Sequence, residues 1–302
     1  MSRTCTMGLL AVLVMLPALL VMLAPNRVGA GPLSEVILFA AKTDRYTQIQ
    51  MVRPDGRDLG FLIRLRGYCR QPDLCSRTGL VVFAVYEHGS WNLYRVDLSG
   101  RNLQRLTSSP SDDRHPSWSP DGTRIVFETN RWGAEELAIM KADGTDLRRL
   151  TSDQTINRFP TWSPDGSRIA FVGWRQGSSD LYTTPAENPG RATRITRNFY
   201  ADVTPAWSPD SRHLVYGSWN HLRGFLAVIG PEGVPRRLLQ GTESASYPAW
   251  SPDGRQLLFT ARTGNGAALY TVPVEGGSPE LFPTPPFTEV YDLVWKRRPL
   301  PW

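Results

Sequence analysis

Hydrophobic and polar residues alternate along this chain in short segments, and one combination of segments occurs four times. Each copy is a short strand that ends in tryptophan, a polar Ser-Pro-Asp turn, and an apolar strand that ends in an aromatic residue. The copies are HPSWSPDGTRIVF (residues 115–127), FPTWSPDGSRIAF (159–171), TPAWSPDSRHLVY (204–216) and YPAWSPDGRQLLF (247–259). The intervals of 44, 45 and 43 residues separate the tryptophans Trp118, Trp162, Trp207 and Trp250. Self-similarity at this period is typical of propellers and other repeat architectures.

The aromatic residue that ends the second strand recurs even where the tryptophan motif is absent. It occurs six times, at Phe39, Phe83, Phe127, Phe171, Tyr216 and Phe259. After it come a polar loop, a third strand such as WNLYRV (91–96), a turn rich in Gly and Asp, and a fourth strand such as LRRLT (147–151). Four strands in about 44 residues is the size of a propeller blade. The sequence therefore predicts six blades.

The two ends of the repeat complement each other. The first unit begins at Ser34 on its second strand, without a first strand of its own. The segment from Val290 to Trp295 places Trp295 45 residues after Trp250 and supplies the missing strand. We therefore predict an all-β fold, a six-bladed β-propeller of four-stranded antiparallel blades, as a single domain over residues 31–302. Its C-terminal strand joins the N-terminal blade and closes the ring.

Each position of the repeated motif has a structural explanation. The Asp-Gly pair supplies the positive φ of a tight hairpin, and the preceding Ser and Pro favour a turn. The tryptophan ends the innermost strand, where a large ring fills the wedge between neighbouring blades. Trp118, Asp121 and Gly122 are therefore predicted to be structural. Turn roles on separate blades are likewise predicted for Asp165, Asp210 and Asp253.

The first 30 residues differ from the rest of the chain. Arg3 precedes an apolar run over residues 7–24, and the small residues of VGA (28–30) match a signal-peptidase site. Residues 1–30 are therefore predicted to be a signal peptide cleaved after Ala30. Because the run has 18 residues, an uncleaved N-terminal membrane anchor is the alternative. Either interpretation places the body outside the cytoplasm, in the periplasm or secreted.

Charge and cysteine content narrow the classes of partner and the compartment. Without residues 1–30 the chain carries a net charge of +4 and no long run of like charges, so a nucleic-acid partner is not expected.

Cys69 and Cys75 form an even pair in an oxidising compartment, which favours a disulfide. Six extended residues would separate them by about 20 Å, so a bridge requires a curled loop. Buried free thiols are the alternative.

The WSPDG-type repeats, with RIVF or RIAF behind them and LRRLT closing the unit, resemble the propeller repeats of the TolB family. The resemblance covers about residues 34–302. It implies a periplasmic protein of the Tol-Pal system that binds a peptidoglycan-associated lipoprotein at one face of its propeller. TolB proteins also carry an α/β domain before the propeller, whereas in this chain SEVILF (34–39) starts the first blade. The resemblance therefore implies a TolB-like propeller alone.

Candidate binding residues lie on the face where loops join the second to the third strand and one blade to the next. These loops vary between the copies and are rich in aromatic residues and arginine, which are enriched at binding hot spots. The predicted partner-binding residues are Arg114, His115, Arg158, Phe159, Tyr200, Asp202, Tyr247, Tyr291, Trp132, Trp174, Trp219 and Arg262.

Motifs of catalysis are absent from the sequence, which has no GxSxG elbow, phosphate loop, HExxH or zinc-type cysteine cluster. We therefore expect no catalysis, no cofactor and no metal site, and a monomer that binds an envelope protein or peptide. A carbohydrate-active or metal-dependent propeller that uses the same face is the alternative. Its acid–base candidates are Asp113, His115, Asp202 and Glu289. A scaffold without a small ligand is a third interpretation.

Overall fold

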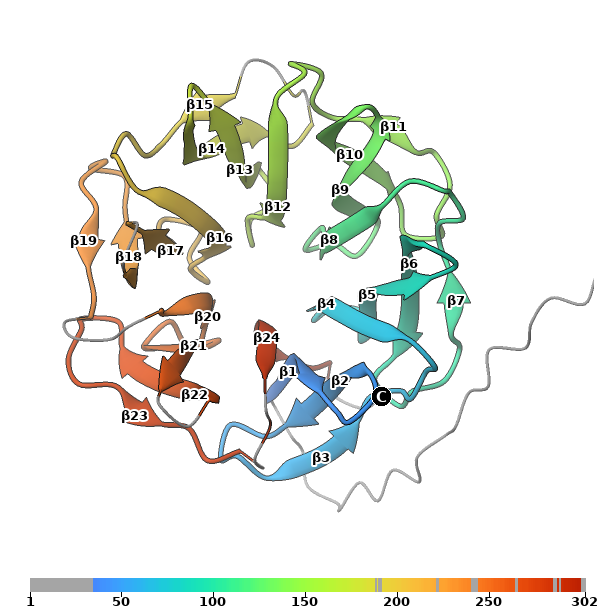
Figure 1. Ribbon diagram of the computed structural model, residues 1–302, viewed down its shortest axis with the longest axis horizontal. Helices are drawn as coiled ribbons and strands as arrows, with labels where there is room; N and C mark the ends of the chain where they lie inside the picture. The colour runs from blue at the N-terminus through green and yellow to red at the C-terminus, as the bar shows by residue number, and fades with distance from the viewer. Residues whose placement is uncertain are drawn as a thin grey trace, which may run out of the picture.

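The predicted propeller fold is confirmed. The computed structural model describes residues 35–299 apart from 188, 190, 191, 221, 222, 240–243, 264, 265, 285, 286 and 288, so the predicted signal peptide lies outside the described residues. Six four-stranded antiparallel sheets surround one axis, with the first strand of each blade innermost (Figure 1). In the described part of the chain, no helix has the length and apolar character needed to cross a membrane.

Each blade extends from an innermost strand at the axis to an outermost strand at the rim. In that order, blade 1 consists of β24 (Val290–Arg297), β1 (Glu35–Lys42), β2 (Thr47–Val52) and β3 (Asp58–Phe61). Blade 2 consists of β4 (Tyr68–Leu74), β5 (Leu80–Glu87), β6 (Ser90–Asp97) and β7 (Gln104–Arg105). Blade 3 consists of β8 (Asp113–Trp118), β9 (Arg124–Trp132), β10 (Ala134–Lys141) and β11 (Arg148–Arg149). Blade 4 consists of β12 (Ile156–Trp162), β13 (Arg168–Arg175), β14 (Ser178–Pro185) and β15 (Thr193–Arg194). Blade 5 consists of β16 (Ala201–Trp207), β17 (Leu214–Trp219), β18 (Gly224–Ile229) and β19 (Arg236–Arg237). Blade 6 consists of β20 (Ser246–Trp250), β21 (Gln256–Thr263), β22 (Gly266–Pro273) and β23 (Glu280–Leu281).

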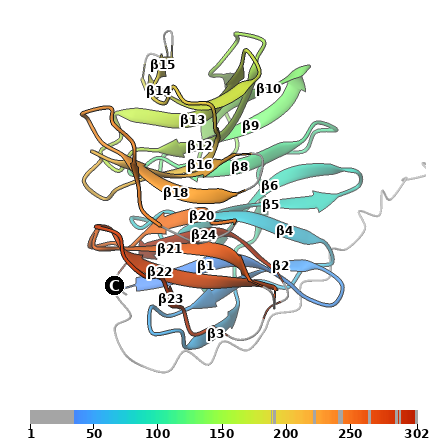
Figure 2. The ribbon, with the colours of Figure 1, turned by 60° about the vertical axis from the view of Figure 1, so that its left-hand side comes forward.

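The last strand closes the ring as predicted. β24 lies antiparallel to β1, with Trp295 opposite Ile37, so the first and last strands share one sheet (Figure 2). The indole N–H of Trp295 donates to Oε2 of Glu35 at 3.0 Å. Because β24 occupies the inner edge of β1, blade 1 has the same four strands as the other five.

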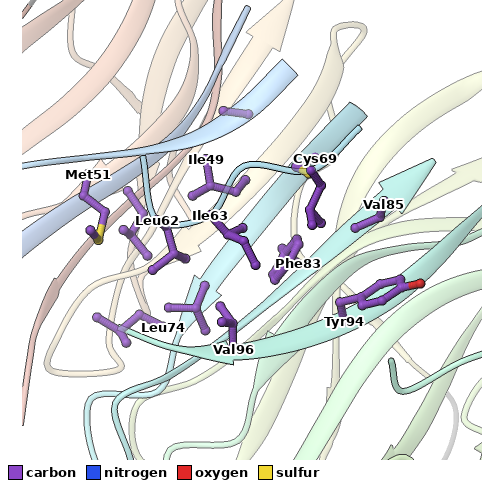
Figure 3. Packing of buried hydrophobic residues seen from close by; sticks show 14 of the residues in the cluster. Ile49, Met51, Leu62, Ile63, Cys69, Leu74, Phe83, Val85, Tyr94 and Val96 are labelled. Atoms are coloured by element: carbon purple, nitrogen blue, oxygen red, sulfur yellow. The ribbon is translucent and has the colours of Figure 1, made fainter. Parts of the chain in front are cut away.

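The hydrophobic core lies between neighbouring blades. Figure 3 shows the cluster between blades 1 and 2, where Ile49 and Met51 of β2 face Phe83 of β5 and Val96 of β6. Alternate residues of a strand enter opposite interfaces, since Leu38 belongs to this cluster and Phe39 to the cluster between blades 1 and 6. The aromatic residues that marked the repeat in the sequence are all at most 1% exposed: Phe39, Phe83, Phe127, Phe171, Tyr216 and Phe259.

A β-bulge interrupts the innermost strand of every blade. In blade 3 the pairing shifts between Arg114 and Ser117, so two residues of β8 lie opposite Phe127 of β9. The first bulged residue has a positive φ in all six blades, and none is glycine: Gln71, His115, Phe159, Thr204, Tyr247 and Asp292. Non-glycine residues rarely adopt this conformation, and bulges re-aim side chains. In this propeller the six bulges form a ring around the axis.

The predicted turn roles of the repeated aspartates are confirmed. Oδ1 of Asp121 accepts hydrogen bonds from the hydroxyl of Ser119 at 2.6 Å and the N–H of Thr123 at 3.0 Å. Gly122 has a φ of 74° in this hairpin, whereas the third copy places Ser211 at a φ of 60°. Asp165, Asp210 and Asp253 make the same bond to the serine two residues earlier.

The tryptophans of the motif fill the spaces between blades as predicted. All five are at most 8% exposed: Trp118, Trp162, Trp207, Trp250 and Trp295. The indoles of Trp207 and Trp250 donate to carbonyl groups of the preceding blade, at Thr161 and Ala206, over 3.3 and 3.1 Å. Each of these two rings therefore joins two neighbouring blades as well as filling the wedge between them.

The predicted disulfide between Cys69 and Cys75 is wrong. Both residues are buried free thiols. Cys69 belongs to the cluster between blades 1 and 2, whereas Cys75 belongs to the cluster between blades 2 and 3 (Figure 3 labels Cys69). The chain between them is strand β4 and not a curled loop, so the two sulfurs lie on opposite sides of one sheet. Burial raises the pKa of the Cys69 thiol to about 12.

Candidate functional site

A cavity of about 470 Å³ lies inside the ring, between the innermost strands. It runs from the bulge residues to the prolines that open the Asp-Gly turns. Two sets of prolines contribute to its wall: Pro72, Pro116, Pro160, Pro205 and Pro248 beside the bulges, and Pro120, Pro164, Pro209 and Pro252 at the turns. The five tryptophans also line it. Because the turn prolines are largely exposed, we call this end of the cavity the turn-face mouth.

The six bulge residues line the other end of the cavity, and we call them the bulge ring: Gln71, His115, Phe159, Thr204, Tyr247 and Asp292. The residues that precede them on the innermost strands do not line the cavity. The bulge ring is held by contacts between consecutive blades. The N–H of His115 donates to Oε1 of Gln71 at 3.1 Å, and the rings of His115 and Phe159 meet edge to face at 4.3 Å.

A buried glutamate supports two members of the bulge ring from behind. Oε2 of Glu128 accepts the N–H of Phe159 at 3.0 Å, and Oε1 lies 2.9 Å from Nδ1 of His115, outside good hydrogen-bond geometry. Burial opposes ionisation of Glu128, but His115 and the N–H of Phe159 hold its pKa below the usual value. An ionised Glu128 therefore fixes the backbone of the bulge in blade 4 and lies beside the imidazole of the bulge residue in blade 3.

Asp292 is held on the opposite side of the bulge ring. Oδ2 accepts a hydrogen bond from Nε of Arg70 at 2.9 Å and another from the N–H of Gln71 at 3.1 Å. The guanidinium of Arg70 lies 4.1 Å from the ring centre of Tyr291, which meets Tyr247 edge to face at 6.2 Å. These contacts connect the last strand β24 to blades 2 and 6.

Charged side chains occur on one side of the cavity only. Asp73 lies on β4, and Asp292, Lys296 and Arg297 lie on β24. Apart from His115, the lining residues of blades 3 to 6 are apolar or uncharged. The cavity wall is therefore mostly proline and aromatic, with one polar arc formed by blades 1 and 2.

Three of the twelve predicted binding residues line the cavity: His115, Phe159 and Tyr247. Tyr291 lies beside it, in contact with Tyr247 and Arg70. Two arginines are engaged elsewhere, because Arg114 pairs with Asp112 and Arg158 pairs with Glu135. The structure therefore brings together the predicted residues nearest the axis.

The other predicted residues are spread around the blades. The ring centre of Trp132 lies 6.0 Å from the guanidinium of Arg131 and 5.3 Å from that of Arg149, and Trp174 is 47% exposed. Tyr200 packs on Phe225, the Trp219 ring lies against Gly224, and Arg262 is exposed. None of these lines the cavity.

The predicted acid–base candidates do not converge. Asp113 is fully buried and makes a two-pronged ion pair with Nη2 of Arg131, at 2.7 and 2.8 Å. Glu289 pairs with Lys42 at 2.7 Å. Asp202 lies behind the wall, and only His115 lines the cavity. Within the described residues, no three His, Cys, Asp or Glu side chains gather as metal ligands.

Asp202 has an unusual environment for a carboxyl group. It is fully buried, and it accepts hydrogen bonds from the hydroxyl of Ser218 at 2.7 Å and Nδ2 of Asn198 at 3.0 Å. Burial outweighs these bonds and raises the pKa of Asp202 to about 6. The folded protein therefore retains a proton at Asp202 at pH values where an unfolded chain has lost it.

We expect Asp202→Asn to remove one source of pH dependence. Between about pH 4, the pKa of an unfolded aspartate, and pH 6, the wild type loses stability as pH rises, because its folded state binds more protons. We compare the free energy of unfolding of the variant with that of wild type at each pH. The difference should shift in favour of the variant by up to about 3 kcal/mol between pH 4 and pH 7.5. Urea unfolding at the two pH values measures this difference.

Asp165→Asn is the opposite control. The hydroxyl of Ser163 holds the pKa of Asp165 below its usual value, so the stability it contributes is present at neutral pH and lost in acid. The free energy of unfolding of this variant should therefore be lower than that of wild type at pH 7.5 and approach the wild-type value in acid. An Asp202→Asn stability curve parallel to that of wild type would contradict the role of Asp202.

Sequence reasoning missed the polar arc and Gln71. Blade 2 has Leu74 where the other blades have tryptophan, so its innermost strand carries no visible motif. The buried aromatics give the missing signal, because Phe83 and Phe127 are 44 residues apart, as are Gln71 and His115. Lys296 and Arg297 belong to a basic C-terminal patch that resembles a solvated tail in the sequence.

Comparison with known proteins agrees with this architecture. A crystal structure of TolB from Acinetobacter baumannii superposes with a TM-score of 0.75 at 21% identity, over 88% of this chain and 67% of that chain. A putative TolB from Agrobacterium tumefaciens gives a TM-score of 0.66 at 17% identity, over 89% of this chain and all of that chain (100%). At these identities the likeness establishes the fold alone.

Sequence comparison identifies the family. The Tol-Pal system protein TolB of Anaeromyxobacter sp. (strain K) is 31% identical over 110 residues, which is 33% of this chain and 25% of that protein. The match thus spans a quarter of the curated relative. The family model of the TolB beta propeller domain (PD40) matches residues 129–295, more than half of the chain. The chain therefore belongs to the TolB β-propeller domain family.

Proposed function

We propose that this propeller is an exported binding module of the cell envelope that captures a protein or peptide segment in the cavity inside its ring. The cavity is the observation that supports this proposal. Its volume of about 470 Å³ is in the range of ligand sites, and its wall combines apolar rings with a few placed polar groups. Rigid proline and tryptophan walls lose little entropy when they order a ligand.

The cavity suits an extended segment better than a compact globular surface. The wall consists of the innermost strands, which carry aromatic side chains at two levels of the cavity. One level is the bulge ring, with His115, Phe159 and Tyr247, and the other is formed by the tryptophans. Aromatic and proline rings give a partner large apolar contacts, and such buried anchors carry most of the energy of an interface. A loop or chain end of a partner is therefore the ligand that we propose.

The relative's name suggests a system in which this binding takes place. The Anaeromyxobacter proteins that match are named Tol-Pal system proteins. We propose a role of this kind, with a peptidoglycan-associated lipoprotein as the first partner to test. Action by binding, without catalysis, is part of the same proposal, and the separation of Asp113, Asp202 and Glu289 supports it.

We expect Thr204→Tyr to block the cavity without disturbing the fold. Thr204 lines the cavity at a φ of 49°, and blade 6 has Tyr247 at the equivalent position with a φ of 51°. The larger ring should reduce capture of a peptidoglycan-associated lipoprotein from an envelope extract at least ten-fold, because it fills the space that the partner needs. Quantified pull-down, with circular dichroism of the variant, measures the effect.

Two controls separate the tunnel from the rest of the surface. Thr193→Tyr adds the same ring at an exposed position on the outermost strand and should leave capture unchanged. Arg262→Glu reverses a charge on the loop face, which the sequence predicted as the binding face. Loss of capture in Arg262→Glu together with full capture in Thr204→Tyr would move the site from the tunnel to the loop face.

A further inference from the structure

The polar arc of the cavity arises where the repeat is broken. In blades 3 to 6 the lining segment has a proline after the bulge residue and Trp-Ser-Pro at its end. Blade 2 has QPDLCS (71–76) and blade 1 has DLVWKR (292–297) at the same place. Because these two strands are neighbours, their departures from the motif face the same part of the cavity.

Both acidic groups of the arc are already engaged by the protein. Asp292 accepts hydrogen bonds from Arg70 and from the N–H of Gln71. Oδ2 of Asp73 accepts the N–H of Trp118 at 2.8 Å, and its Oδ1 lies 3.6 Å from Nζ of Lys296. Asp73 is thus tied to the backbone of blade 3 and makes only a loose pair with Lys296.

The basic groups of the arc are only partly engaged, because the single ion pair that they make with a described residue is the 3.6 Å contact of Lys296 with Asp73. The side chain of Lys296 is 45% exposed. Arg297 is exposed and makes no ion pair with any described residue. Glu35 is its partner in the strand pairing, but the carboxylate of Glu35 accepts the indole N–H of Trp295. The cavity therefore presents two cations at its turn-face mouth and an apolar wall below them.

We propose that the captured segment carries an acidic side chain that pairs with Lys296 and Arg297 while apolar residues occupy the cavity. This inference rests on the proposed function and specifies its ligand class. Lys296 is three residues beyond Leu293, which lines the cavity beside the bulge ring, so extended geometry separates the two levels by about 10 Å. The acidic residue therefore lies about three residues from the deepest apolar residue of the segment.

Pairing at this mouth should select ligands without dominating their affinity. Both cations are partly hydrated. The binding free energy that the pairing contributes should therefore lie between that of a surface ion pair and that of a charge-assisted hydrogen bond. A preference of about ten-fold for acidic over neutral segments is expected on this basis, and it should shrink as salt is added.

Pools of synthetic peptides test the proposal on the exported protein. Each pool contains acetylated, amidated heptapeptides with three consecutive positions drawn from Leu, Phe, Pro and Ala, and with Glu, Gln or Lys three residues from the central one. We expect the immobilised protein to retain the Glu pool about ten-fold better than the Gln pool and to retain the Lys pool least. In a Lys296→Gln, Arg297→Gln double variant, Glu and Gln pools should be retained equally.

Controls make the outcomes distinct. Arg255→Gln removes an exposed arginine of the same face that does not line the cavity, and it should keep the full preference for Glu. Equal retention of all three pools by wild type overturns the acidic-ligand inference and leaves the binding function standing. Retention of no pool overturns both. Selective binding of decanoate without any peptide would identify a lipid-like anion as the ligand and overturn the inference as well.

Discussion

Ending the chain at residue 289, which removes β24, is expected to abolish the folded ring. Val290, Leu293 and Trp295 are each at most 8% exposed, and burial of such side chains contributes about 1.5–3 kcal/mol each. Their loss, with the hydrogen bonds between β24 and β1, approaches the roughly 5–15 kcal/mol that stabilises a typical domain. The open edge of β1 would also invite pairing with other chains. Near-ultraviolet circular dichroism and limited proteolysis measure the result.

A chain that ends at residue 299 is the matched control. It keeps β24 and Pro299, which packs against Gly79 of blade 2, and should melt within a few degrees of the full chain. The strand added back as a synthetic peptide should restore protection from protease to the shorter chain in a dose-dependent way. A cooperative melting transition in the chain ending at 289, at the temperature of the full chain, would show that closure is dispensable.

The sequence predicts the architecture well because the repeat reports local structure. The buried aromatics recur every 43 to 45 residues because each one lies opposite the bulge of its own blade, where it is at most 1% exposed. The closing strand is predictable for a related reason, because Trp295 continues the spacing set by Trp250. The first signal depends on an aromatic position shared by all six blades, and the second on a tryptophan shared by five of them.

The cavity is harder to predict because its wall consists of the same residues that build the blades. Pro116 and Trp118 belong to the repeated motif and have structural roles, yet both also line the cavity. In a closed ring the innermost strand has to serve both purposes. A search for residues that escape the repeat identifies His115 and Phe159 but passes over the proline wall.

The error over Cys69 and Cys75 has a different origin. Compartment and even number favoured a bridge, and both are properties of the whole chain. The position of strand β4 is a local property, and it places the two thiols in separate clusters. No motif marked β4 as a strand, because Leu74 replaces the tryptophan of the other blades.

An ion pair between a buried carboxylate and an exposed arginine holds the outermost strand of blade 3. Glu136 is fully buried, and its carboxylate accepts hydrogen bonds from Nη2 of Arg149 at 2.8 Å, the N–H of Gln154 at 3.1 Å and the hydroxyl of Thr151. Thr151 in turn accepts the N–H of Leu137 at 2.9 Å. Blade 4 repeats this arrangement with Asp180 and Arg194, at 2.7 Å. The carboxylate thus joins the two-residue strand β11 to β10.

Glu136→Ala is expected to destabilise the protein by about 1–3 kcal/mol. The substitution removes a buried acceptor shared by Arg149, Gln154 and Thr151, and leaving hydrogen-bond donors without their acceptor costs about this much. The exposed Arg149 guanidinium can recover part of its loss from water. For a chain of this size, about 2–4 °C of melting temperature is lost per kcal/mol. Thermal melting and urea unfolding at neutral pH measure the change.

Neighbouring residues provide the controls, and blade 5 suggests how the loss can be relieved. Glu135→Ala breaks a partly exposed pair with Arg158 and should cost at most about 1 kcal/mol. Blade 5 has Phe225 at the position of Glu136, with Arg237 4.4 Å from its ring centre, so an apolar residue is compatible with this blade geometry. The double substitution Glu136→Leu, Arg149→Leu should therefore be milder than Glu136→Ala, because no charge is left unpaired. Equal effects of Glu135→Ala and Glu136→Ala would contradict the contribution assigned to this carboxylate.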